Sequence, residues 1–369
     1  MTGLRSTLGR LFGGSKVEIE GAPPAELTVA PDSAEQIARI LDFASEHALT
    51  VLPWGSGLHQ GFGGRVAPDL VVSTSRLDQV IEWNPGDLTV VAGSGTTLGV
   101  LEDEISSQRQ SAILPEKMPD ATVGGVVASG LSGWRRLRYG PTRDRLLQVE
   151  FVTGDGRVVT GGARVVKNVT GYDLPRLVTG SFGSLGIIAS VCFKLWPIPE
   201  AAATVKTDDP ERALAVTYRP QAVLETQDGV SVYLAGTAAE VEAQATAIAG
   251  VVSAGCSWPE GPVGDCVIRI RVLPTMVPSV VARLGTGRFV AAHGVGEVVA
   301  AVEPEDIEDL REQVENLGGS VIIERAPDAV YEAVHPWGAP PATAELQRRI
   351  KAAFDPLRVL VPGRLPGDI

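Results

Sequence analysis

Glycine-rich turns are the feature of this sequence that most constrains the fold, because closely spaced glycines let the backbone approach another group without side chains in between. The stretch 164–197 contains the turn GSFGSLG at 180–186, followed by an apolar strand that ends at Pro197. A second glycine loop, PWGSGLH, lies at 53–59, and a third turn, TVGG, lies at 122–125. One such turn is a weak signal, but three in one domain indicate a ligand that carries phosphates.

Length and charge narrow the class of protein. At 369 residues the chain is long enough for two or so domains, given roughly 150 residues per domain. The 32 basic and 44 acidic residues leave a net charge of -12, which argues against nucleic acid as a main partner. An anionic small molecule stays compatible with this charge, because a few arginines or backbone N–H groups make a local positive site.

Cysteine spacing and the lack of long apolar runs indicate the cellular setting. Cys192, Cys256 and Cys266 lie far apart and form no C-x-x-C pair, so they cannot by themselves build an iron–sulfur cluster or a zinc site. Arg5 and Arg10 interrupt the first residues, which therefore do not resemble a secretion signal. The sequence contains no stretch of about 18 apolar residues, so it does not predict a transmembrane helix. We expect a reducing, cytoplasmic setting.

Helical patterns and short strands alternate through the first 200 residues. A helix is expected over 32–48, where Ser33 begins a capping-box pattern, and a second helix is expected after Thr97. Turn residues at 84–87 and 154–156 predict two hairpins. The alternation of apolar and polar residues over 190–195 predicts a strand with one buried face. The other expected strands are 50–53, 69–73, 80–83, 88–92, 146–153 and 157–160.

The segment 114–133 leaves two interpretations open. It is rich in glycine and other small residues, so its backbone and Ser129 could wrap around a cofactor. The same composition is typical of a small-residue helix packed tightly on a sheet. The arginines that follow, Arg135, Arg136 and Arg138, are compatible either with a phosphate or carboxylate contact or with a solvated loop.

Beyond residue 200, glycine loops become rare and strands alternate with helices. Thr237 and Glu240 form a second capping-box pattern, and 305–317 has the pattern of a charged surface helix. This alternation of strands and helices predicts a second α+β domain with a mainly antiparallel sheet. The expected strands are 202–207, 222–226, 230–235, 266–273, 288–292, 297–302 and 320–324.

Six motifs follow one another in the chain: PWGSGL at 53–58, DATVGGVVASGLSG at 120–133, RYG at 138–140, KNVTGYDL at 167–174, GSFGSLGII at 180–188 and FDPLRVLVPGR at 354–364. In this order they resemble the FAD-binding fold of the p-cresol methylhydroxylase and vanillyl-alcohol oxidase type (PCMH type). The segment 165–181, followed by a short P-G-R, looks most like the FAD-binding subunits of glycolate oxidase complexes. The likeness extends over nearly the whole chain from about residue 20.

The resemblance implies an α+β fold with a two-subdomain, PCMH-type FAD-binding domain and an inserted cap domain built on an antiparallel sheet. The implied domains are 1–199 for FAD binding, 200–335 for the cap, and 336–369 for the return of the chain to the FAD-binding domain. The resemblance places at the cofactor Pro53, Trp54, Gly55, Ser56, Gly57, Leu58, His59, Pro115, Thr122, Gly124, Gly125, Ser129, Gly133, Tyr139, Gly140, Ile187 and Ile188.

The resemblance also bears on how the flavin is held. Some relatives attach flavin covalently to a histidine that follows a glycine pair, whereas His59 follows Leu58, so we expect non-covalent FAD with His59 as a loop donor. Lys167, Tyr172 and Arg364 are the polar groups expected near the flavin ring, because a substrate carboxylate needs a cation and a phenol. The alternative, that Tyr172 packs and Lys167 is solvated, stays open.

Three departures from the family pattern bear on substrate chemistry. Relatives that oxidise 2-hydroxy acids alone usually carry a glutamate where this chain has Phe182. Their metal-associated H-A-G-D-G-N-x-H element is reduced here to AHGVGE at 292–297, so His293 is either a remnant of such a site or structural, and no metal site is expected. Val361 stands where an asparagine usually precedes the terminal P-G-R. The catalytic residues are left unassigned.

Three functional hypotheses follow from the resemblance. The first is an FAD-binding oxidoreductase subunit of a glycolate or D-lactate dehydrogenase or oxidase complex, which moves hydride from a 2-hydroxy acid to FAD. Its expected partners are a second flavoprotein subunit and an iron–sulfur subunit, with a quinone as another acceptor and any membrane contact made through partners. The second is an accessory electron-relay or structural flavoprotein subunit without its own substrate site. The third is a stand-alone flavin dehydrogenase for another alcohol.

Overall fold

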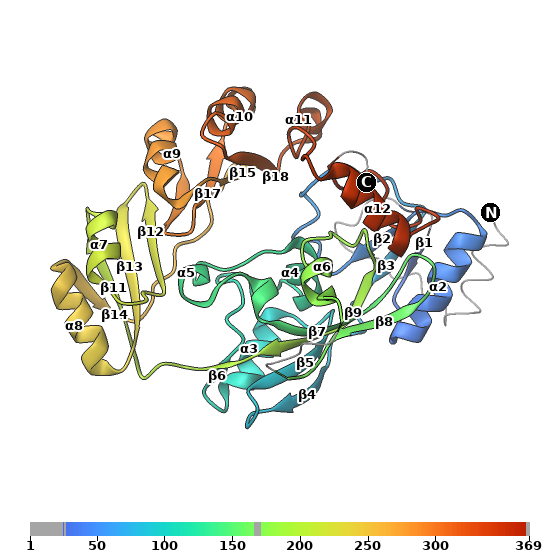
Figure 1. The fold of residues 1–369 in the computed structure, drawn as a ribbon, viewed down its shortest axis with the longest axis horizontal. Coiled ribbons are helices and arrows are strands. Elements are labelled where there is room, and N and C mark those ends of the chain that lie inside the picture. Colours follow the sequence, from blue (N-terminus) through green and yellow to red (C-terminus); the bar gives the residue numbers. More distant parts are fainter. Residues whose placement is uncertain (1–24, 26, 166–170, 367–369) are drawn as a thin grey trace.

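The chain folds into two parts, and its tail returns to the first part. The computed structural model describes residues 25, 27–165 and 171–366. Figure 1 shows the first part in blue to green and the second, in yellow to orange, as a curved layer beside it. Helices together with mainly antiparallel sheets confirm the predicted α+β class. The predicted domain boundaries after residues 199 and 335 stay a prediction.

A small parallel sheet begins the described chain. Ser33 accepts a hydrogen bond from the backbone N–H of Gln36 and so caps the first helix, as the sequence predicts. The apolar face of that helix packs on the sheet, and the sheet's strand Val51–Trp54 runs directly into the loop 53–59. In spatial order the sheet contains β1 (Leu27–Val29), β3 (Leu70–Ser73) and β2 (Val51–Trp54), with α2 (Ala34–Glu46) beside it.

A five-stranded antiparallel sheet lies at the centre of the first part. In spatial order its strands are β4 (Val80–Asn84), β5 (Thr89–Gly93), β9 (Ile187–Lys194), β7 (Leu146–Val152) and β8 (Val158–Gly162). The pairs β4–β5 and β7–β8 are the two predicted hairpins. The face that the sequence predicts to be buried over 190–195 is buried, with Val191, Phe193 and Leu195 at 1%, 0% and 0% exposure. Strand β9 is central and lies between two apolar cores, so Cys192 on its other face is also buried, at 1% exposure.

Short helices connect these strands. Within 114–133, α4 packs on β9, and a Cβ at Gly124 would lie 2.6 Å from the Cβ of Ser94, so this segment does contain a small-residue helix packed on a sheet. The connecting elements are α3 (Leu98–Ser106), α4 (Val123–Ser129), α5 (Arg136–Tyr139), the 3-10 turn η1 (Thr142–Asp144), α6 (Leu174–Val178), and the strand pair β6 (Gln110–Ser111) and β10 (Trp196–Pro197).

The second part is one antiparallel sheet with helices on one face (Figure 1). All the strands that the sequence predicts there are present, while β14 has no counterpart in the sequence prediction. In spatial order the strands are β14 (Val251–Ala254), β11 (Ala201–Thr207), β13 (Gly229–Gly236), β12 (Ala222–Thr226), β16 (Phe289–His293), β17 (Glu297–Val302), β15 (Cys266–Arg271) and β18 (Ser320–Arg325). The helices are α7 (Pro210–Val216), α8 (Ala238–Ile248), α9 (Val277–Leu284) and α10 (Ile307–Glu315), with 3-10 turns η2 (Pro274–Met276) and η3 (Pro304–Asp306).

This sheet consists of two similar halves. Along the chain each half has the order β-α-β-β-α-β, and the halves meet where β12 pairs with β16. Successive side chains of a strand point to opposite faces, so Ile268 and Ile270 of β15 pack in the core with α9 and α10. Arg269 and Arg271 lie on the other face, where they line cavities shared with the first part.

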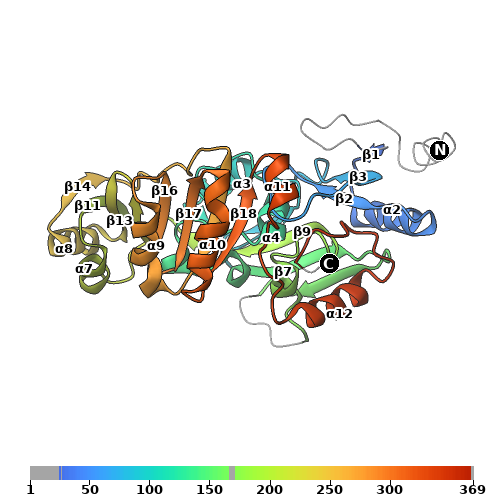
Figure 2. The same cartoon turned by 90° about the horizontal axis from the view of Figure 1, so that it is seen from above.

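Beyond β18 the chain returns to the first part through α11 (Asp328–Ala333) and α12 (Ala344–Phe354). The ring of Phe354 lies 6.0 Å from that of Phe151, and Figure 2 shows α12 beside β7. Leu360 then forms a parallel bridge with Val51 of β2, so the red tail in Figure 1 lies next to the blue strands.

A buried ion pair fastens this tail. The Nζ of Lys351 lies 2.6 Å from Oδ2 of Asp355, and the two side chains are 6% and 0% exposed. Nζ also donates to the carbonyls of Ser184 and Leu360, at 2.8 and 2.7 Å. Asp355 accepts hydrogen bonds from the backbone N–H groups of Val359 and Leu360. The pair is stable in the interior because both charges are fully hydrogen-bonded.

Replacing Lys351 with Met should therefore lower the free energy of unfolding by about 3 kcal/mol or more, because it leaves the buried carboxylate of Asp355 without its cation. The measurement is urea unfolding of the purified variant. Arg348→Met is the control, since Arg348 lies on the same helix in an exposed pair with Glu345 and should cost about 0.5 kcal/mol or less. Equal losses for the two variants would contradict this account.

Candidate functional site

Three glycine-containing segments, distant in sequence, enclose one small cavity of about 70 Å³. The loop after β2 forms one wall, the first turn of α4 a second, and the turn before β9 a third. The cavity is lined by Pro53, Trp54, Gly55, His59, Gln60, Thr74, Ser94, Gly124, Gly125, Ala128, Ser129, Phe182, Gly183, Gly186, Ile187, Ile188 and Arg364.

Two of these glycines are required by close packing. A Cβ on Gly55 would lie 2.4 Å from Oγ1 of Thr122, and one on Gly124 would lie 2.7 Å from the carbonyl oxygen of Ser94. Thr122 itself caps α4 by accepting a hydrogen bond from the N–H of Gly125. The glycines therefore bring the two walls of the cavity together, with backbone at its surface.

Four polar side-chain atoms at this cavity lack a partner among the described residues. They are Nε1 of Trp54, Nε2 of His59, Oγ of Ser94 and Nε of Arg364, and all four atoms are buried. Buried polar groups in folded proteins are nearly always hydrogen-bonded, so four such atoms around one cavity indicate a polar ligand.

Two larger cavities adjoin the small one. The first, of about 450 Å³, shares Ser129 and Phe182 with it, and the second, of about 320 Å³, shares His59. The two larger cavities share Phe62, Leu131 and other wall residues with each other, and both reach the inner face of the second part's sheet. This arrangement suits an elongated ligand that begins in the small cavity of the first part and ends below the sheet of the second part.

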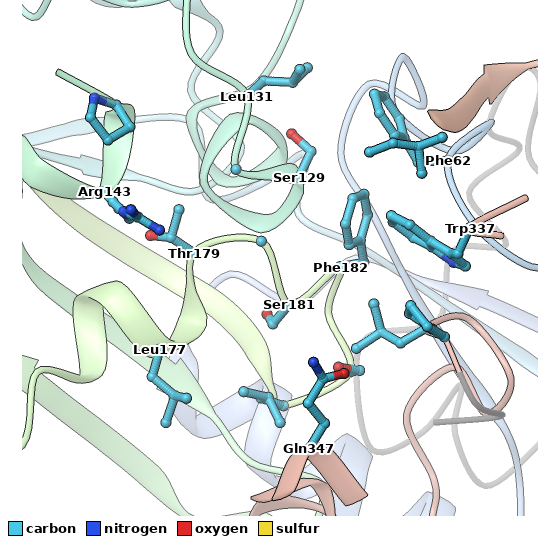
Figure 3. A pocket seen from close by; sticks show the side chains of 18 of the residues that line it. Phe62, Ser129, Leu131, Arg143, Leu177, Thr179, Ser181, Phe182, Trp337 and Gln347 are labelled. Atoms are coloured by element: carbon cyan, nitrogen blue, oxygen red, sulfur yellow. The ribbon is translucent and has the colours of Figure 1, made fainter. Parts of the chain in front are cut away.

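An aromatic cluster forms one wall of the 450 Å³ cavity. The ring of Phe182 lies 5.7 Å from Phe62 and 5.2 Å from Trp337, and Figure 3 shows the three side chains side by side. Trp337 is fixed by a hydrogen bond of 2.9 Å from its Nε1 to the carbonyl of Arg364. The cluster therefore joins the turn before β9, the loop after β2 and the tail.

A charged network covers the sheet face above these cavities. Glu297 accepts hydrogen bonds from Arg269 at 2.5 Å and from Arg136 of α5 at 3.1 Å, and Arg269 also pairs with Glu324. Burial alone would lower the pKa of Arg269, but the two carboxylates raise it above its ordinary value. Burial would raise the pKa of Glu297, but Arg269, Arg271 and Arg136 lower it. The network therefore stays ionised and links the two parts of the molecule.

The residues predicted from sequence are distributed over several surfaces. The small cavity is lined by nine of them: Pro53, Trp54, Gly55, His59, Gly124, Gly125, Ser129, Ile187 and Ile188. Leu58, Pro115 and Gly133 line the 320 Å³ cavity. Ser56, Gly57 and Thr122 are neighbours of these walls in the chain. Their assignment to a ligand stays a prediction.

Tyr139 and Gly140 line none of these three cavities. Tyr139 stacks edge-on against Trp196 and lines a separate cavity of about 420 Å³. The carbonyl of Gly140 accepts a hydrogen bond of 2.6 Å from the buried Arg145.

The sequence prediction missed several residues that line the small cavity. Gln60 and Thr74 follow predicted elements without any distinctive pattern, and Ser94 follows β5 directly. Gly183 and Gly186 belong to the turn that the sequence singled out, but no ligand contact is assigned to them there. A serine flanked by glycines, as in Gly93-Ser94-Gly95, is the one signal that could have identified Ser94.

Of the polar groups expected near a flavin ring, Tyr172 and the buried Arg364 do not lie together. Tyr172 is 92% exposed, and Lys167 lies outside the described residues. His293 is buried and its Nε2 lies 2.7 Å from Oε2 of Glu225, which is a structural pairing. Among the described residues, no group of three or more His, Cys, Asp or Glu side chains is arranged to bind a metal ion. In the part of the chain that the structure describes, no helix has the length and apolar character to cross a membrane.

The burial of His59 predicts acid sensitivity. Burial, and to a lesser degree Arg269, lower its pKa from 6.5 to about 4. Because the unfolded chain binds this proton at higher pH than the folded chain, stability present above pH 6.5 is lost as the pH falls towards 4. Between pH 7 and pH 4, the free energy of unfolding of the ligand-free wild-type protein should fall by about 3 kcal/mol more than that of His59→Gln, at 1.36 kcal/mol per pKa unit. The measurement is urea unfolding at each pH, and identical pH slopes would contradict it.

Comparison with known proteins identifies the ligand class. Residues 25–162 match the family model described as an FAD binding domain. The chain is 34% identical over 183 residues to glycolate oxidase subunit GlcD of Bacillus subtilis, which covers 49% of this chain and 39% of that protein. It is 33% identical over 174 residues to a D-lactate dehydrogenase of Archaeoglobus fulgidus, covering 46% and 39%. It is 38% identical over 133 residues to glycolate oxidase subunit GlcE of Escherichia coli, covering 35% and 37%.

These matches have definite extents. The matched part spans about two fifths of the length of these curated relatives, at 39%, 39% and 37%. Among solved structures, an alkyldihydroxyacetonephosphate synthase aligns with a TM-score of 0.63 over 93% of this chain and 78% of that one. At 16% identity this likeness supports the fold alone.

The donors at the small cavity fit the identified cofactor. FAD is elongated and carries a diphosphate and polar rings, so it can supply partners for the unpaired Trp54, His59, Ser94 and Arg364 atoms. The adjoining cavities extend from these atoms to the sheet of the second part. The chain thus contains an FAD binding domain, has FAD as its cofactor, and is related to glycolate oxidase subunits and D-lactate dehydrogenases.

Proposed function

We propose that the chain is an FAD-dependent oxidoreductase that takes hydride from a 2-hydroxy acid such as glycolate or D-lactate. The observation that carries this proposal is the charge of the 450 Å³ cavity. Its charged lining residues are Arg136, Arg143 and Arg271, and no acidic residue lines it among the described residues. In a protein of net charge -12, such a cavity selects an anion.

The arginines differ in how free they are to bind a carboxylate. Arg136 is held by Glu297, whereas Arg271 has a half-exposed side chain whose Nε lies 3.7 Å from the same carboxylate. Arg143 forms no ion pair with a described residue, and Figure 3 shows it across the cavity from Phe182 and Trp337. Guanidinium groups bind a carboxylate through paired hydrogen bonds, so Arg271 and Arg143 are the proposed anchors.

The cofactor would occupy the small cavity and extend into the larger ones. Its holding residues are proposed to be the loop 53–59, the first turn of α4 and the strand start at Ile187 and Ile188. When bound, FAD supplies the hydride-accepting ring. The chain's own residues hold the acid by its carboxylate, and the aromatic wall of Phe62, Phe182 and Trp337 limits the access of water to that side.

Electrons would leave through a partner. Two of the chain's three cysteines, Cys192 and Cys266, are buried in separate strands, so this chain does not assemble an iron–sulfur cluster from them. The names of two relatives, subunits of glycolate oxidase, support membership of a complex. We propose a second flavoprotein subunit and an iron–sulfur subunit as partners, in the cytoplasm.

An accessory flavoprotein subunit is the second candidate. The aromatic ring of Phe182 occupies the position where self-sufficient relatives usually carry a glutamate, and it packs in the cavity wall. His293 is paired with Glu225 and lines none of the cavities described above. Both observations favour a chain that binds FAD but relies on a partner for substrate oxidation.

The first experiment is anaerobic addition of glycolate, and then of D-lactate, to the purified FAD-loaded protein. Loss of the oxidised-flavin absorbance is expected with one of the two acids. If the flavin stays oxidised until partner subunits are added, the accessory role holds instead.

Arg271→Met tests the proposed anchor. The acid concentration for half-maximal flavin reduction should rise about tenfold or more, because hydrogen bonds to charged groups contribute about 1.5 kcal/mol or more each. The matched control is Arg283→Met, which removes an exposed arginine from helix α9 on the same sheet. It should leave the acid concentration for half-maximal flavin reduction unchanged. An unchanged Arg271→Met profile would remove this residue from the substrate site.

A further inference from the structure

Arg364 is a buried cation at the end of the described tail. Its residue is 5% exposed, and it lies just beyond Leu360, whose bridge to Val51 brings the tail alongside β2. β2 leads into the glycine loop, so the tail and the loop are neighbours although their residues are about 300 positions apart, as in the pair Gln60 and Arg364 with a separation of 304.

The side chain of Arg364 forms its hydrogen bonds with this loop. Nη2 donates to the carbonyl of Gln60 and to its side-chain Oε1, each at 3.0 Å, and to the carbonyl of His59 at 3.5 Å. Nη1 reaches the carbonyl of Gly64 at 3.4 Å. The contact is reciprocal, because the carbonyl of Arg364 accepts hydrogen bonds from the N–H of Gly64 and from Nε1 of Trp337.

The guanidinium nevertheless lacks a counter-ion. Its partners are neutral oxygens, and no described Asp or Glu forms an ion pair with it. Its Nε is buried without a partner. Burial lowers its pKa to about 10, with Tyr331 and Arg65 as smaller influences. A buried charge without a counter-ion is unfavourable, so this site favours an anion.

The cavity beside Arg364 defines the anion. Arg364 is the single charged side chain among the described residues that line the small cavity, and it does not line the 450 or the 320 Å³ cavity. The same cavity holds the glycine loop, the first turn of α4 and the unpaired Nε1 of Trp54. A ligand anion there meets backbone on two sides and one cation on the third.

We infer that the guanidinium of Arg364 is the counter-ion for the diphosphate of FAD and holds the loop 53–64 in its binding conformation. The inference needs FAD as cofactor and is independent of which substrate is oxidised. It differs from the sequence expectation, which places Arg364 at the flavin ring for a substrate carboxylate. The carboxylate anchors instead line a different cavity.

The test compares Arg364→Met and Arg364→Lys for FAD affinity in the protein stripped of FAD, measured by quenching of flavin fluorescence on titration. Arg364→Met should weaken FAD binding at least about tenfold, because it removes the cation and its hydrogen bonds to the loop. Arg364→Lys should recover part of this loss, since it restores the charge without the forked donors. If Arg364→Met binds FAD within about twofold of the wild type, the inference is overturned.

Arg65→Met is the matched control. Arg65 lies next to the same loop and joins it to α11 through Asp328 and the ring of Tyr331, but it lines none of the three cavities. The Arg65→Met substitution should lower the unfolding temperature and leave the affinity for FAD unchanged. If Arg65→Met and Arg364→Met weaken FAD binding equally, Arg364 acts only by supporting the loop and its counter-ion role is wrong.

A second measurement needs no variant. The FAD-free wild-type protein is heated with ADP or with adenosine, which differ in the diphosphate. ADP should raise the unfolding temperature and adenosine should not, because only ADP brings the anion that Arg364 lacks. Equal effects of the two ligands would contradict a counter-ion role, even if Arg364→Met fails to fold.

Discussion

The ion pair between Lys351 and Asp355 is the interaction on which the remaining architecture depends. It ties α12 to the turn that precedes β9 and to the last strand-like residues beside β2. That turn supplies Phe182, Gly183 and Gly186 to the small cavity, and the last residues supply Arg364. Because a buried pair is stable only with complete hydrogen bonding, the positions of these two walls are defined together.

The sheet of the second part places charge by strand alternation. Every second side chain of β15 faces the helices and is apolar, while Arg269 and Arg271 between them face the cofactor domain. Glu297 on the neighbouring strand neutralises part of this positive charge and links it to Arg136 of the first part. One strand therefore both builds a core and presents the proposed anion-binding residues.

Local sequence patterns were sufficient for much of the fold. Hairpin turns, helix caps and alternating strands depend on residues close in sequence, and β4–β5, the Ser33 cap and the strands of the second part follow from them. The strand β14 was missed because its four residues are exposed edge residues with no alternation in burial. The burial of both faces of β9 depends on its central position, which alternation cannot reveal.

For the site, the glycine loop and α4 were accessible because close approach between segments requires glycine, as at Gly55 and Gly124, and glycine is visible in the sequence. Ser94 and the use of Arg364 depend on contacts between distant segments, and no pattern near either residue encodes them.

The distance in sequence between the cavity walls has a consequence for how the protein is made. During translation, residues 53–64 emerge long before the strands of the second part, and Arg364 emerges after all of them. A nascent chain can thus fold its parallel strands early, yet the cofactor cavity lacks its cation until the tail has left the ribosome and docked. Completion of the proposed FAD site is in this sense a late event in biosynthesis, coupled to the folding of everything encoded between its two halves.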